Sequence, residues 1–490
     1  MTIAPHSSTI TDPELDSRFG PIFDRIAEGA VEREVDRRLA HTEVDWLRGA
    51  GFGALRVPSE LGGLGASVRQ QFRLLIDLAA AESNLPQALR VHWWFVEDQR
   101  LATDPRQRER WLRAVAGGAL VGNAITEPGV GAVDRYRTTV TPDATGDGYL
   151  LDGTKYYSTG SLFADHIVVA ADRDGERVSV LVDGDAPGVT QHDDWDGFGQ
   201  RTTASGTTEF HGVRVPADRF LGPGYGTAGK GYGTSYLQLV QLAVLAGIAQ
   251  RATDDAITWV RERTRSYTHA AADLPRNDPL VQQVIGRLSA AGFSARSTVL
   301  AVADLLDELL DDAQRRGGDP DETLVDRAEL VSAQAQATVI DQVLDATSQL
   351  FEVGGASIVS ERHRLDRHWR NARTVAVHNP LIYKLRSVGP TCSTATRCPT
   401  RGAPGAAREP SAQPSSTARM RGRSRAGSRR RMFGDLFGAD VTVIAAELTA
   451  AGEDPTLDPP RPGAARSRAA APTLAGETAT RCASRVGPRG

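Results

Sequence analysis

The chain has 490 residues, which is more than one hydrophobic core usually needs, so we expect two or three packed domains. Its 40% hydrophobic and 24% charged residues are typical of a globular protein, and a net charge of -4 argues against a general nucleic-acid binder. No apolar run approaches the length of a membrane span, and residues 1–17 lack the pattern of a secretory signal. We therefore expect a cytoplasmic protein whose partners include neither nucleic acid nor membrane.

The cysteines are confined to the last fifth of the chain, as Cys392, Cys398 and Cys482. The chain before Gly389 can therefore form neither a disulfide nor a thiolate metal site. Redox chemistry there would require a bound organic cofactor or a metal site without thiolates, and no pattern of metal ligands stands out.

Residues 1–119 have helical periodicity and predict an N-terminal helical domain. Val44 and Leu47 share one apolar stripe, and leucines at helical spacing recur from Leu74 to Leu85. The segment 57–65, Val-Pro-Ser-Glu-Leu-Gly-Gly-Leu-Gly, interrupts this pattern with a proline and three glycines, which predicts a structured turn.

Residues 120–225 change to a period of two and predict a central β domain. Residues 149–156 suggest a hairpin turning at Asp152-Gly153, and residues 167–182 suggest another turning at Asp174-Gly175. Phe210, Val213 and Val215 alternate with polar residues and indicate a further strand.

Helical spacing returns over residues 226–389, with stripes such as Leu239, Val240 and Val244, and predicts a C-terminal four-helix bundle. Helices, then strands, then helices make an α+β fold with segregated layers.

Residues 390–490 differ from the rest of the chain. From Pro390 to Arg431 the sequence is rich in Arg, Pro, Ser, Gly and Ala, has Glu409 as its only acid and shows no hydrophobic period. Such a segment cannot bury enough surface to offset its ordering entropy, so we expect a disordered tail. We favour an extension without an evolved role over a partner-binding tail. The abrupt change of composition is also what a shifted reading frame in a GC-rich gene would produce.

Five motifs carry a family resemblance. They are the 57–65 turn, Thr126-Glu127-Pro128 within 125–131, the 153–160 segment Gly-Thr-Lys-Tyr-Tyr-Ser-Thr-Gly, Gln349 with Gly354-Gly355, and Arg370-Asn371-Ala372-Arg373. Their order and placement resemble the acyl-CoA dehydrogenase superfamily over roughly residues 12–389. The resemblance implies a three-domain architecture with a central β-barrel-like domain and a flavin between that domain and the C-terminal bundle.

The resemblance also implies which residues bind the flavin. Thr126 would serve the pyrimidine edge of the ring, Ser158 and Thr159 would face its reactive N5 and C4a positions, and Arg263 would reach a phosphate, often across a subunit interface. The full set of cofactor-binding candidates is Ile125, Thr126, Gly131, Tyr157, Ser158, Thr159, Arg263, Gly354, Gly355 and Arg370.

The position that favours an oxygenase follows Arg373. Many members of the family carry a Tyr-Glu-Gly segment there, whose carboxylate removes a substrate proton. This chain has His378-Asn379-Pro380, and the amide of Asn379 cannot act as a base. Residues 374–380 instead resemble the THxxHDP-type segment of the oxygen-using branch. That branch includes dibenzothiophene and sulfone-acquisition monooxygenases. Its members also carry a histidine in the region that corresponds to His92.

This resemblance implies a monooxygenase that must exclude water, since reduced flavin otherwise yields hydrogen peroxide. His92, His378, Ser158 and Thr159 are the catalytic candidates, and Trp93, Trp94 and Phe95 would help to form an apolar pocket. No Gly-rich nicotinamide motif follows a strand, so a separate flavin reductase would supply reduced FMN, with FAD the less favoured cofactor. We expect O2 and a small apolar substrate, with sulfur compounds among the candidates, and a homotetramer.

Two alternatives stay open at this point. The chain could be an FAD-dependent acyl-CoA dehydrogenase whose base is displaced to another helix. It could also be an inactive or poorly folding product, because the Arg/Pro-rich tail stands where the family completes its bundle.

Overall fold

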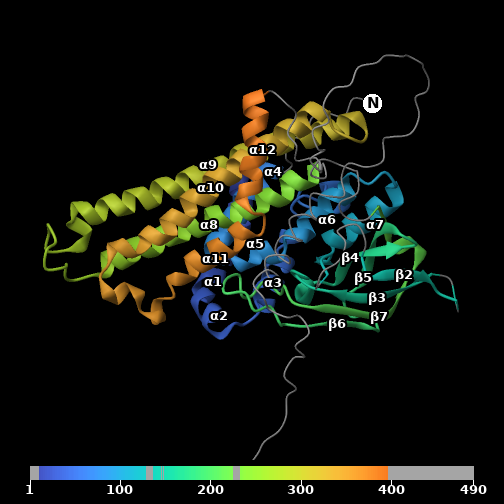
Figure 1. Cartoon of the computed structure of the whole chain (residues 1–490), viewed down its shortest axis with the longest axis horizontal. Coiled ribbons are helices and arrows are strands. Elements are labelled where there is room, and N and C mark those ends of the chain that lie inside the picture. Colours follow the sequence, from blue (N-terminus) through green and yellow to red (C-terminus); the bar gives the residue numbers. More distant parts are fainter. Residues whose placement is uncertain (1–9, 128–135, 145, 147, 224–231, 395–490) are drawn as a thin grey trace, which may run out of the picture.

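The computed structural model describes residues 10–127, 136–144, 146, 148–223 and 232–394. Helices form both ends of this part of the chain, and a β-sheet lies between them in sequence (Figure 1). The predicted order of helical, β and helical regions is therefore confirmed, and Gly131 and the tail after Thr394 lie outside the described residues.

The N-terminal helices begin at polar caps that the sequence provides. Thr11 with Glu14 and Ser67 with Gln70 form reciprocal capping boxes, which satisfy backbone N–H groups at the starts of α1 and α4. The helices are α1 (Asp12–Glu28), α2 (Ala30–Asp36), α3 (His41–Gly49), α4 (Val68–Ala81), α5 (Asn84–Ala88), α6 (Arg90–Arg100) and α7 (Pro105–Ala116). The turn at 57–65 is confirmed by positive φ angles at Gly62 and Gly65.

The described residues of the central domain form one sheet of eight strands. They are β1 (Val121–Ala124), β2 (Thr139–Pro142), β3 (Tyr149–Lys155), β4 (His166–Arg173), β5 (Glu176–Asp183), β6 (Val189–Gln191), β7 (Thr208–Val215) and β8 (Phe220–Pro223). The pairing order is β6-β7-β3-β2-β4-β5-β8, and β1 pairs with β4 in parallel. Strand β1 ends at Ala124, and the chain continues from this end of the strand to Thr126.

One of the two predicted hairpins is confirmed and the other is wrong. Asp174 and Gly175 both have positive φ, as the tight turn between β4 and β5 requires. In contrast, β3 runs straight through Asp152-Gly153 without turning. Gly153 lies at a register shift against β7, where a Cβ atom would lie 2.4 Å from the Thr138 hydroxyl oxygen. The glycine therefore marks a β-bulge and a close backbone approach.

Three long helices dominate the C-terminal region and project away from the sheet (Figure 1). The helices are α8 (Tyr232–Glu262), α9 (Pro279–Arg316), α10 (Glu322–Gln349), α11 (Asp366–Val377) and α12 (Leu381–Thr394). Helix α4 packs against α8 and α9, so the N-terminal helices and the bundle share one apolar core. Helix α12 continues to Thr394, past the expected boundary at Gly389.

Short 3-10 turns join these elements, and no described helix is long and apolar enough to cross a membrane. The turns are η1 (Phe52–Ala54), η2 (Ser59–Leu61), η3 (Ser161–Phe163), η4 (Ala217–Arg219), η5 (Pro275–Asn277), η6 (Leu350–Val353), η7 (Ala356–Val359) and η8 (Glu361–His363).

Candidate functional site

The end of strand β1 is tied to the turn that follows β3. The Tyr156 backbone N–H donates to the carbonyl of Thr126 over 2.8 Å. The ammonium of Lys155 lies 3.1 Å from the Ile125 carbonyl oxygen and 2.8 Å from Glu127 Oε1. Burial lowers the pKa of Lys155 to about 8, although Glu127 opposes this shift. The 125–131 motif and the 153–160 motif, which lie apart in sequence, therefore meet at one end of the sheet.

A second loop, residues 199–206, packs against the turn 156–160. Ser158 donates its backbone N–H to the carbonyl of Gly206, and Gly160 donates to that of Thr203, both over 3.0 Å. Tyr157, Gln200 and Ala204 all have φ between +51° and +57°. Left-handed backbone is costly for residues with side chains and gathers at functional sites. Three such residues in two touching loops thus mark this place as a candidate site.

The two neighbouring hydroxyls of this turn are in different states. Thr159 Oγ1 lies 2.8 Å from Ser205 Oγ, which also contacts Thr203 Oγ1. Ser158 is fully buried, and its Oγ has no hydrogen-bond partner among the described residues. A buried hydroxyl without a partner costs free energy, so it is expected to be satisfied by a bound group. The turn therefore fits a polar ligand such as a flavin edge, which Ser158 would contact.

Helix α11 closes another side of the site. Asn371 accepts the backbone N–H of Gln200 over 2.6 Å and donates to Ser83 Oγ over 3.2 Å. A Cβ atom at Gly199 would lie 2.5 Å from the Thr374 hydroxyl oxygen, so α11 and this loop are in close contact. The helix thus carries its C-terminal residues toward the same region.

His378 follows α11 and meets Arg90 at the start of α6. The distance from an Arg90 terminal nitrogen to His378 Nε2 is 3.2 Å, and His378 Nδ1 is buried without a partner among the described residues. Burial and then the Arg90 charge lower the pKa of His378 to about 3. Ala88, two residues before Arg90, packs against Gly160, since a Cβ there would lie 2.0 Å from the Ala88 carbonyl oxygen. Helices α5 and α6 therefore connect His378 with the turn that bears Ser158.

Asn379 is buried and held as an amide. Its Nδ2 donates to Oε1 of Gln238 over 2.6 Å and to Oε1 of Gln241 over 3.1 Å, both on α8. The amide of Asn379 cannot act as a base, so this position offers no group that could remove a proton from a substrate.

His92 is not brought to His378. Its Nε2 lies 3.0 Å from the Gly53 carbonyl, and its Nδ1 accepts the Val121 N–H over 3.2 Å. Burial lowers the pKa of His92 to about 4. Because Arg90 and His92 are two positions apart on a helix, they face nearly opposite sides. Both nitrogens of His92 therefore have backbone partners, away from the other candidates.

The other candidates fall into two groups. The guanidinium of Arg370 contacts Glu34, Asp366 and the Phe198 carbonyl, so it supports the chain just before the 199–206 loop.

Arg263 follows the end of α8 and stacks on Trp259 at 5.1 Å. It lies near Gly354, where a Cβ atom would meet Trp259 Nε1 at 2.8 Å. From Gln241 to Glu262, α8 extends roughly 30 Å at about 1.5 Å per residue. Because Asn379 contacts Gln241 near one end of this stretch and Trp259 contacts both Arg263 and Gly354 near the other, Arg263, Gly354 and Gly355 lie far from His378 of the same chain.

Of the three aromatic residues expected to line a pocket, only Trp94 is half-exposed. Trp93 and Phe95 are buried in two different hydrophobic clusters. The ring of Trp94 lies against Gly233 at the start of α8, where a Cβ would approach within 2.3 Å.

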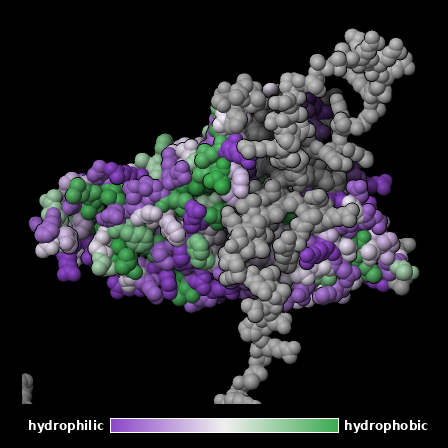
Figure 2. Space-filling view, viewed as in Figure 1, coloured by the Kyte–Doolittle hydropathy of each residue, from purple (hydrophilic) through white to green (hydrophobic). Residues whose placement is uncertain are grey.

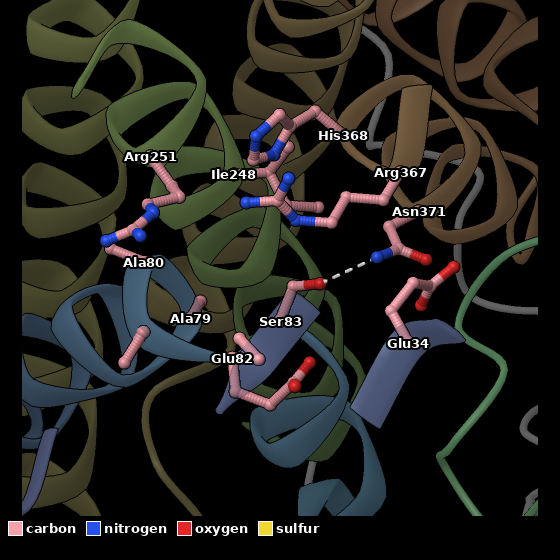
Figure 3. Close-up of a pocket in the computed structure, with 12 residues that line it drawn as sticks. Glu34, Ala79, Ala80, Glu82, Ser83, Ile248, Arg251, Arg367, His368 and Asn371 are labelled. Carbon is pink, nitrogen blue, oxygen red and sulfur yellow. Dashed lines mark hydrogen bonds between the residues drawn. The ribbon is translucent and has the colours of Figure 1, made fainter. Parts of the chain in front are cut away.

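A polar pocket lies behind the site, between α2, the α4–α5 junction, α8 and α11 (Figure 3). Arg251, Arg367 and His368 face Glu34 and Ser83 across it. Burial and then contacts with Arg367 lower the pKa of His368 to about 4. Pockets for apolar ligands are lined mainly by apolar groups, so this one does not suit a small apolar substrate.

Three residues of the site, Arg90, Gln200 and Ser205, were not predicted from the sequence. Arg90 is separated from His378 by 288 positions, and Gln200 from Asn371 by 171. Ser205 was indistinguishable from other loop serines, although it holds Thr159. Only Arg90 had a weak cue, because it lies two residues before a histidine that was already a candidate.

Comparisons with known proteins identify the family of the chain. Three sequence families match the chain: acyl-CoA dehydrogenase N-terminal domain over residues 22–119, middle domain over 122–213 and C-terminal domain over 239–381. A dibenzothiophene monooxygenase from Mycolicibacterium goodii is 31% identical over 376 residues, which cover 73% of this chain and 88% of that protein.

Two further proteins extend the comparison. The probable FMNH2-dependent monooxygenase SfnC from Pseudomonas putida is 28% identical over 74% of this chain and 91% of its own length. The crystal structure of FMN-bound TdsC from Paenibacillus sp. A11-2 superposes with a TM-score of 0.72 at 29% identity, covering 78% of this chain and 97% of that one. The chain therefore belongs to the acyl-CoA dehydrogenase family, in its flavin-dependent monooxygenase branch.

Proposed function

We propose that the chain is a two-component monooxygenase that takes reduced FMN from a separate flavin reductase and uses O2 to oxygenate a small apolar compound. The observation that carries this proposal is Asn379, a buried amide fixed by Gln238 and Gln241 where many dehydrogenases of this family carry their catalytic carboxylate. One oxygen atom would enter the substrate and the other would leave as water, with reduced FMN supplying the two electrons.

Residues from two segments would hold the ring of the cofactor. Ile125 and Thr126, at the end of β1, would meet one edge of the ring, and Tyr157, Ser158 and Thr159 would face it from the turn after β3. The buried and unpartnered hydroxyl of Ser158 supports this assignment, because a hydrogen-bonding group of the ring would satisfy it. Gly131, the remaining candidate of the 125–131 motif, lies outside the described residues.

The protein residues would control protons and water. Ser158 and His378 are the polar groups we propose to contact the reactants, with Thr159 positioned by Ser205. Trp94, half-buried against α8, would help to keep water out, which limits the release of peroxide. His92 would influence the site only indirectly, because its ring connects the Gly53 carbonyl with the Val121 N–H at the start of β1.

We further propose a homotetramer in which each site is completed by a neighbouring chain. Arg263, Gly354 and Gly355 lie at the far end of α8 from Asn379, so a second protomer would supply them to a flavin held at Ser158, with the guanidinium suited to a phosphate. Large apolar side chains are exposed on the long helices, among them Leu280 and Phe293 on α9 and Ile382 on α12. In Figure 2 such hydrophobic residues form small groups over the helical part of the surface.

Sulfur compounds are the substrates we favour, since a relative named for dibenzothiophene oxidation covers most of the chain. A cytoplasmic location, where a reductase and NADH are at hand, is part of this proposal.

The proposal is tested with the full chain, FMN, a generic flavin reductase, NADH and O2, against a panel of sulfur and nitrogen compounds. The expected result is a product heavier by one oxygen atom, detected by mass spectrometry, with label from 18O2. Thioester-dependent bleaching of bound FAD would instead identify a dehydrogenase. Peroxide without any product, or a chain that binds no flavin, would favour an inactive product.

A further inference from the structure

The contact between Arg90 and His378 fixes more than a position. Arg90 is buried, at 7% exposure, and one of its terminal nitrogens lies 3.2 Å from His378 Nε2. A guanidinium has only N–H donors, and it stays protonated in proteins. The Nε2 atom must therefore be the acceptor, so it carries no proton.

The tautomer follows from this contact. A neutral imidazole has one N–H, and with Nε2 accepting from Arg90 that N–H must be on Nδ1. Protonating Nε2 would break the hydrogen bond and place two positive charges side by side in a buried environment. The pKa of His378, lowered to about 3 by burial and by Arg90, agrees with a neutral ring.

The surroundings of the Nδ1–H group of His378 indicate its role. Nδ1 is buried and has no hydrogen-bond partner of good geometry among the described residues, so its N–H is available to a bound group. The adjacent Asn379 side chain offsets only part of the lowering of the His378 pKa. Helix α6 begins two residues after Ala88, which packs on Gly160 in the turn that bears Ser158. The donor thus belongs to the walls of the proposed flavin site.

We propose that Arg90 is a positioning residue that holds His378 as its neutral Nδ1–H tautomer, so that His378 serves the reaction as a fixed hydrogen-bond donor and not as a proton carrier. The proposal rests on the proposed function, because the group that accepts this hydrogen bond would be the oxygen-bearing cofactor or the substrate. It separates Arg90 from His92, which lies on the opposite side of α6 and has backbone partners for both nitrogens.

Three variants test the assignment. Arg90→Met removes the donor and the charge but keeps most of the side-chain length. Arg90→Lys keeps a charged donor, and Arg106→Met removes an exposed arginine on α7 as a matched control. The tautomer is read directly by nitrogen-15 solid-state NMR of the flavin-loaded protein with labelled histidines. His378→Gln identifies the signal of His378 among the ten histidines.

We expect the wild type, Arg90→Lys and Arg106→Met to show a protonated Nδ1 and an unprotonated Nε2 on His378. In Arg90→Met the other tautomer should appear, and a protonated ring should accumulate as the pH falls below about 6. With any compound that is oxygenated, the ratio of product to peroxide should fall about tenfold in Arg90→Met and should recover in Arg90→Lys.

An unchanged tautomer in Arg90→Met would overturn the proposal, as would a changed tautomer with an unchanged product-to-peroxide ratio. Thermal melting and FMN titration check that each variant folds, and Arg90→Gln replaces Arg90→Met if the latter does not. If no compound is oxygenated by the wild type, the proposed function fails. The NMR result still decides whether Arg90 sets the tautomer.

Discussion

The hydroxyl of Thr159 lies 2.8 Å from the hydroxyl of Ser205, while that of the adjacent Ser158 has no partner among the described residues. The two residues should therefore respond differently to loss of the hydroxyl. Ser158→Ala should leave the melting temperature nearly unchanged but weaken FMN binding about tenfold, the loss of one hydrogen bond. Thr159→Val should lower the free energy of unfolding by about 1 kcal/mol.

The measurements are flavin fluorescence titration and thermal melting of both variants. An equal loss of stability in the two variants, with no change in FMN affinity for Ser158→Ala, would contradict the role given to Ser158.

Gly160 should not tolerate a side chain. Its φ is +78°, and a Cβ would lie 2.0 Å from the carbonyl oxygen of Ala88, so Gly160→Ala forces backbone apart. We expect a loss of more than about 2 kcal/mol by urea denaturation, from left-handed strain and the clash together. Gly175→Ala is the control, because its φ is +86° but no atom lies within 4 Å of the added Cβ. It should cost only about 1 kcal/mol, and similar losses at both positions would show that the contact with Ala88 is unimportant.

Stability should fall as the pH drops below 6.5. Burial lowers the pKa of His92 and of His368 to about 4, and that of His378 to about 3, below the value of about 6.5 expected in the unfolded chain. Between these values the unfolded chain takes up protons that the folded chain does not. The stability from neutral histidines is thus fully present above pH 6.5 and is lost toward pH 4.

The expected slope is roughly 1.4 kcal/mol per pH unit for each histidine, measured by urea unfolding between pH 6.5 and 5, above the range where most carboxylates titrate. His92→Gln should reduce the slope by the contribution of one histidine, roughly 1.4 kcal/mol per pH unit. A flat profile over this range would mean that the buried histidines are not neutral in the folded protein.

Periodicity and turn chemistry were enough to predict the order of the elements. The Asp174-Gly175 hairpin was correct because both residues can adopt positive φ, which its two-residue turn requires. The same pair of residue types at Asp152-Gly153 was misleading. There the glycine is required by the close approach of Thr138, the residue just before β2, and a single-strand pattern does not report that contact.

The site was predicted only where motifs carry it. The strand end at Thr126 and the turn at Ser158 were expected together, and the Tyr156–Thr126 hydrogen bond joins them. The strained backbone at Gln200 and Ala204 was not foreseen, because neither residue type favours left-handed geometry. The contact of Arg90 with His378 depends on how α6 and α11 pack, which local sequence does not determine.

The length of α8 has a consequence for mixed assemblies. If Ser158 and Arg263 serve one flavin only from different chains, then no single polypeptide owns a complete active centre. Ser158→Ala and Arg263→Ala proteins, each impaired alone, should regain part of their activity when they are unfolded together and refolded as hybrids. In such hybrids some sites combine the Ser158 of an Arg263→Ala chain with the Arg263 of a Ser158→Ala chain, whereas refolding each variant separately restores nothing.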